Sequence, residues 1–62
     1  MPQITLKAAR INAHLKQREA AKKLGISYQT LSKYESDPSD ITQKMLDKMA
    51  EVYNMPKKFF FL

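Results

Sequence analysis

Residues 17–35, with the sequence QREAAKKLGISYQTLSKYE, contain the pattern that decides the fold of this chain. Ala20, Ala21 and Leu24 place small and apolar side chains on one face of a short helix. Gly25 is the one glycine of the sequence, and it comes directly after this face. Because glycine adopts a positive φ without a Cβ clash, it is expected to end the helix in a tight turn.

A second helix is predicted immediately after that turn. Ser27 is a good N-cap, because its hydroxyl can accept a backbone N–H two or three residues further on. Leu31 and Tyr34 then recur at helical spacing and are expected to point inward. The two helices, over about residues 17–24 and 28–35, form a helix-turn-helix, in which the second helix fits the major groove of DNA.

The flanking sequence predicts further helices that hold this unit. The first is expected over about Leu6–His14, with Thr5 as its N-cap. Another is expected over about Thr42–Tyr53, capped by Asp40 or Thr42 and ended at Asn54, after a loop over residues 36–40. A short last helix should begin at Met55-Pro56, where the missing N–H of proline costs little.

Length and composition set the limits of what the chain can be. Its 62 residues allow one domain, residues 1–62, and contain no cysteine for a disulfide or thiolate metal site. Eleven Lys and Arg against six Asp and Glu give a net charge of +5, which favours an anionic partner. We expect no secretory signal, no membrane span and no membrane partner, and therefore a cytoplasmic protein.

Catalysis and metal binding have little support in the sequence. No nucleophile stands beside a base, no glycine-rich phosphate loop is present, and so short a domain offers hardly any pocket. His14 is the one histidine and has no second ligand at suitable spacing. We therefore expect no enzyme, no metal, no cofactor and no small-molecule substrate.

The outward face of the second helix of the unit has the polar side chains that a DNA-reading helix needs. Gln29 can make paired hydrogen bonds to adenine, and Lys33 can reach guanine or a phosphate. Tyr28 and Thr30 can contact a base edge, a thymine methyl or a phosphate. Gln17 opens the preceding helix, where backbone N–H groups and the amide together can hold a phosphate.

The run from Leu15 to Glu35 resembles the helix-turn-helix of the phage-repressor and Cro family, also called XRE-like. The matching residues are Gln17, Glu19, Ala20-Ala21, Leu24-Gly25-Ile26-Ser27 and Thr30-Leu31-Ser32-Lys33-Tyr34-Glu35. The resemblance implies an all-α, compact, four- to five-helix domain of the lambda-repressor type. It implies a transcriptional regulator, most simply a repressor of phage or mobile-element type, that binds a pseudo-palindromic operator as a homodimer in the nucleoid.

The resemblance also assigns roles to residues. Base reading is expected from Tyr28, Gln29 and Lys33. The family's phosphate contacts correspond to Gln17, Ser27, Thr30, Lys33 and the loop after the second helix of the unit. Lys16 and Arg18 add positive charge beside Gln17, so these two residues and Ser32 are also expected to contact the DNA backbone. Arg10 and Glu35 are expected to form a buried or half-buried ion pair. Lys16 departs from the family pattern, which usually has Ser or Thr there as the N-cap.

The C-terminal run leaves two alternatives open. Phe59, Phe60, Phe61 and Leu62 cannot all face one core on a short helix, which indicates a dimer or partner contact, or a longer regulator cut at a domain boundary. A simpler interpretation is that two of the phenylalanines cap the core and the other residues are frayed. One alternative is therefore a protein-interaction module that uses this patch. The other is an antitoxin that represses its own promoter and binds a toxin through its terminus.

Overall fold

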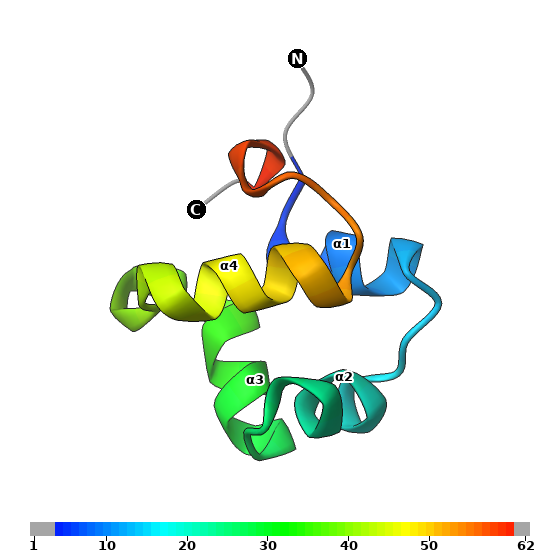
Figure 1. Cartoon of the computed structure of the whole chain (residues 1–62). Helices are drawn as coiled ribbons and strands as arrows, with labels where there is room; N and C mark the ends of the chain where they lie inside the picture. The colour runs from blue at the N-terminus through cyan, green and yellow to red at the C-terminus, as the bar shows by residue number, and fades with distance from the viewer. Residues whose placement is uncertain (1–3, 61–62) are drawn as a thin grey trace.

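The computed structural model describes residues 4–60 as helices joined by short loops (Figure 1). Within this range, four α-helices follow one another along the chain: α1 (Leu6–Asn12), α2 (Gln17–Leu24), α3 (Tyr28–Ser36) and α4 (Gln43–Val52). Two 3₁₀ turns complete the order, η1 (Pro38–Asp40) and η2 (Lys57–Phe59). The all-α fold class expected from the sequence is confirmed.

Hydroxyl side chains begin three of the helices. Thr5 Oγ1 accepts the backbone N–H of Ala8 at 3.1 Å at the start of α1. Ser27 does the same for α3 at 3.2 Å, and Thr42 for α4 at 3.1 Å. Each bond satisfies a backbone donor that the first helical turn leaves without a partner. Of the two caps proposed for α4, the structure uses Thr42 rather than Asp40.

Three helices end in the same way, with a residue in the left-handed region. Gly25 has φ 74° after α2, Asn54 has φ 53° after α4, and His14 has φ 61° after α1. In each case the next backbone N–H bonds to a carbonyl five residues back, at distances of 3.0, 2.9 and 3.3 Å. This left-handed turn stops α1 at Asn12, so the expected extension of this helix to His14 is wrong.

The core lies where the faces of the four helices meet. α2 packs against both α3 and α4, and its small residues Ala20 and Ala21 are buried and allow this close approach. Met49 and Leu31, from α4 and α3, are fully buried. The whole buried apolar set is Leu6, Ala9, Ala20, Ala21, Leu24, Leu31, Leu46, Met49, Tyr53 and Phe60.

The first and last described segments lie side by side near α4 (Figure 1). The backbone N–H of Ile4 donates to the carbonyl of Phe59 at 2.8 Å, and Ile4 and Phe60 form an isolated parallel bridge. The short last helix expected from Met55-Pro56 is therefore only the single turn η2, because the chain becomes extended at Phe60. No helix within residues 4–60 is long and apolar enough to cross a membrane.

Candidate nucleic-acid interface

The first turn of α3 presents polar and aromatic side chains to solvent. Tyr28 is its first residue and is 37% exposed, and Gln29 beside it is also exposed. Lys33 follows one turn on, with 66% of its side chain exposed. Its Nζ lies 3.7 Å from Asp40 Oδ2 at the surface, a contact that solvent weakens. All three side chains expected to read bases are therefore accessible.

The N-terminus of α2 lies beside this turn and carries positive charge. Lys16 stands at the N-cap position, where it has no hydroxyl to offer. Glu19 still stabilises the start of the helix, because its carboxylate accepts the backbone N–H of Lys16 at 3.0 Å. The Arg18 guanidinium lies over the Tyr28 ring, with Cζ 4.2 Å from the ring centroid. Residues of α2 and α3 assigned to DNA contact are thus in direct contact with each other.

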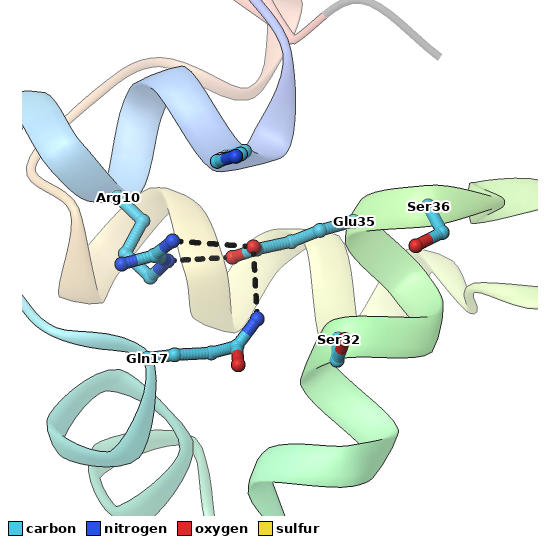
Figure 2. A pocket seen from close by; sticks show the side chains of 6 residues that line it. Arg10, Gln17, Ser32, Glu35 and Ser36 are labelled. Carbon is cyan, nitrogen blue, oxygen red and sulfur yellow. Dashed lines mark hydrogen bonds and ion pairs between the residues drawn. The ribbon is translucent and has the colours of Figure 1, made fainter.

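Arg10 and Glu35 form a buried ion pair between α1 and α3 (Figure 2). Arg10 Nε donates to Glu35 Oε2 at 2.7 Å, and Nη2 donates to Oε1 at 3.3 Å. Their side chains are only 10% and 5% exposed. Arg10 Nη1 also donates to the carbonyl of Leu15, in the loop that leads to α2, at 2.9 Å.

Gln17 joins this pair through its side chain. Its Nε2 donates to Glu35 Oε1 at 3.2 Å (Figure 2). The Glu35 carboxylate thereby links α1, α2 and α3. Because a carboxylate only accepts hydrogen bonds, the NH₂ group of the Gln17 side chain faces it. An open hollow of about 490 Å³ lies here, lined by Lys7, Arg10, Gln17, Ser32, Glu35 and Ser36. Sequence reasoning gave no role to Lys7 or Ser36, because only the approach of α1 to α3 brings them together.

The hydroxyl residues expected at the DNA backbone divide into two groups. Ser27 and Thr30 lie together, with their hydroxyl oxygens 2.8 Å apart in the cap of α3. Ser32 is not part of this cap, and it lines the hollow together with Glu35 (Figure 2). A single DNA backbone strand along the first turn of α3 would therefore meet the first group more readily than Ser32.

Two groups near the helix ends have shifted pKa values. Burial, together with the negative charge of Glu35, raises the pKa of Tyr53 to about 12, although Arg10 opposes the effect. The Tyr53 hydroxyl has no hydrogen-bond partner among the described residues. Asp37, in the loop after α3, accepts the Ser39 backbone N–H at 3.2 Å, and this bond holds the pKa of its carboxyl below the usual value.

The C-terminal patch is only partly described. Phe59 is half-buried and Phe60 is 6% exposed within the core, so Phe60 has little surface left for a partner. Phe61 and Leu62 lie outside the described residues. Within residues 4–60, no three His, Cys, Asp or Glu side chains gather in a group that could hold a metal ion.

Comparison with known proteins places this geometry in a family. The model of a family described as helix-turn-helix, of XRE type, matches residues 6–60. The chain belongs to this family. The matched range contains every helix in the described part of the chain, and the family supports a DNA-binding helix-turn-helix regulator. Searches of curated proteins and of solved structures found no match.

Proposed function

We propose that this family member is a repressor-type transcriptional regulator that recognises a specific double-stranded DNA sequence. α3 enters the major groove and reads bases with Tyr28, Gln29 and Lys33, while the N-terminus of α2 holds the DNA backbone. The observation that carries the proposal is the exposed polar first turn of α3 beside the cationic start of α2. An anchored backbone fixes the register in which α3 meets the base edges.

The distribution of charge supports the same proposal. Lys16 and Arg18 flank Gln17 at the N-terminus of α2, where the helix dipole also favours an anion. The net charge of +5 adds attraction at longer range. DNA phosphates are therefore attracted to this end of the molecule both at short and at long range. Such a regulator would act on the chromosome in the nucleoid.

The arrangement on DNA is a homodimer on a pseudo-palindromic operator. One copy presents a single recognition helix, which covers only a few base pairs and gives limited specificity. Two copies on half-sites one helical turn apart, about 34 Å, read twice as many bases. The phage-repressor and Cro resemblance of residues 15–35 supports this arrangement.

A selection from random duplex DNA, sequenced and repeated at two salt concentrations, tests the proposal. We expect enrichment of a two-fold symmetric motif at both concentrations, with weaker total binding at the higher one. Retention of DNA without any enriched motif would reduce the protein to a basic domain that binds phosphates. An enriched motif without symmetry would keep specific reading but contradict the homodimer.

The role of Gln29 has its own test on the selected operator. Gln29→Ala should cost about 1–3 kcal/mol of binding free energy and relax the preference at one base pair per half-site. Affinity for unrelated duplex DNA should stay nearly unchanged. Equal weakening on operator and unrelated DNA would contradict base reading by Gln29. Lys33→Ala, compared through the salt dependence of binding, separates a phosphate contact from a base contact for Lys33.

A protein-interaction function has weaker support. The face of α3 that such a module would use is polar, whereas the centre of a protein interface is usually apolar. Phe60, the centre of the proposed C-terminal patch, is in the core. An antitoxin would use the same DNA-binding face, so the selection experiment applies to it as well.

A further inference from the structure

Arg18 and Tyr28 form a contact that the proposed roles of either residue alone do not explain. Arg18 is in the first turn of α2 and Tyr28 is the first residue of α3. The guanidinium lies over the aromatic ring at 4.2 Å from the centroid, which is well within the range of a cation–π contact. The pair bridges the two N-termini that face DNA in a helix-turn-helix.

Stacking changes what an arginine can do. An unsupported surface arginine samples many rotamers, and it meets phosphates mainly as a mobile positive charge. A guanidinium held over a ring at this distance has fewer rotamers open to it, while the N–H donors around its edge can still bind a ligand. Less conformational freedom is then lost on binding, so directional hydrogen bonds are favoured over a diffuse charge contact.

The position of the ring determines what those donors would meet. Tyr28 is at the end of α3 that contacts base edges in this motif. A guanidinium over this ring therefore lies beside the end of α3 that would enter the groove. Within residues 4–60 the structure has three ion pairs, Arg10–Glu35, Lys33–Asp40 and Lys57–Asp47, and Arg18 takes part in none of them. Its donors therefore remain available for a ligand.

We propose that Arg18 reads a guanine in the major groove and that Tyr28 is the positioning residue that holds its guanidinium in the required plane. Guanine presents two acceptors, O6 and N7, at the spacing of the arginine fork, and the pairing is bidentate. This inference rests on the proposed function and changes one role within it. Arg18 moves from the backbone set to the base-reading set, and Tyr28 acts partly through it.

Arg18→Lys is the decisive variant, because it keeps the charge but removes the planar fork. On the operator selected by the wild-type protein, we expect a loss of affinity of roughly 5- to 150-fold, the usual value of a bidentate base contact. Affinity for unrelated duplex DNA should change little. A repeated selection with this variant should lose the preference for G·C at one base pair per half-site and keep the remaining positions.

Variants at Tyr28 test the positioning role. Tyr28→Ala should weaken the preference at that same base pair, and Tyr28→Phe, which keeps the ring, should restore it. Once Arg18 is Lys, Tyr28→Ala should cause no further loss at that position, because the two residues act as one unit. Independent, additive losses would show that Tyr28 does not act through Arg18.

The outcomes separate this inference from the proposed function. A wild-type protein that selects no motif would overturn the proposed function and this inference with it. A wild-type motif that Arg18→Lys leaves unchanged would overturn the inference alone. Equal weakening of Arg18→Lys on operator and unrelated DNA would likewise return Arg18 to the phosphate-contact set, with the proposed function intact.

Discussion

At the scale of the residue, His14 adopts a backbone conformation that its side chain disfavours. Its φ of 61° lies in the left-handed region, where the Cβ atom crowds the following carbonyl. The chain accepts this conformation because it closes the end of α1 and brings the Leu15 N–H to the Arg10 carbonyl at 3.3 Å. Gly25 adopts the same left-handed conformation after α2, and because it has no Cβ it does so without this strain.

His14→Gly should therefore stabilise the protein. Removing the Cβ relieves a strain of about 1 kcal/mol, part of which is lost again through the greater freedom of glycine in the unfolded chain. Urea denaturation should show a small gain in the free energy of unfolding. Lys22→Gly, within α2, is the matched control and should destabilise by roughly 0.5–1 kcal/mol. A loss of stability in His14→Gly equal to that of the control would contradict the strain argument.

Tyr53 should make the stability of the protein decrease at alkaline pH. Its pKa is about 12 in the folded protein, above the usual value near 10, so the unfolded chain releases the phenolic proton first. This contribution is fully present below pH 10 and is lost as the pH rises toward 12. The loss is on the order of 2–3 kcal/mol at most.

Tyr53→Phe isolates this contribution. Because the hydroxyl has no hydrogen-bond partner among the described residues, its removal should cost little stability at pH 7. The difference in free energy of unfolding between Tyr53→Phe and the wild type should then grow between pH 10 and 12. Parallel pH profiles for the two proteins would show that Tyr53 titrates normally. A large loss at pH 7 would show that its hydroxyl is bonded.

At the scale of the element, the Arg10–Glu35 pair fixes how α1, α2 and α3 meet. Glu35→Gln leaves the Arg10 charge buried without a countercharge, and this should cost about 3–5 kcal/mol of stability. Asp40→Asn, which removes the exposed partner of Lys33, is the control and should cost less than about 1 kcal/mol. Urea denaturation measures both. Similar stabilities for the two variants would contradict the structural importance of the buried pair.

Helix positions are predictable from sequence where local signals decide them. The turn Leu24-Gly25-Ile26-Ser27 contains both a stop and a cap, and α2 begins and ends where the pattern placed it. The end of α1 lies before His14 because this residue is in the left-handed conformation, which a histidine predicts far less strongly than a glycine does. The last helix is only the single turn η2, because Phe60 pairs with Ile4 at the other end of the chain. The local sequence around Phe60 cannot predict a contact with so distant a residue.

At the scale of the whole molecule, some features of the candidate site are predictable from the sequence and others depend on how the helices pack. The identity of the exposed residues on α3 follows from its periodicity, since Leu31 has to face the core. The contacts of Gln17 with Glu35 and of Arg18 with Tyr28 do not follow from spacing. These contacts depend on how closely the helices approach one another. The small residues of α2 allow a close approach, but they do not indicate which side chains it brings together.

The size of the molecule predicts how two copies share an operator. The part of the chain that the structure describes measures 30 × 24 × 18 Å, so in the proposed arrangement the centres of two copies, about 34 Å apart, are separated by little more than one molecular length. In this proposed arrangement the described residues of the two copies can form only a narrow contact, and we expect a monomer in dilute solution that dimerises on DNA. A pair of half-sites at the selected spacing should bind at least about tenfold more tightly than the independent half-sites predict, a coupling of roughly 1.4 kcal/mol.

Inserting five base pairs turns the copies to opposite faces of the DNA and should abolish this gain. Equal cooperativity at both spacings in a gel-shift titration would exclude direct contact between the copies.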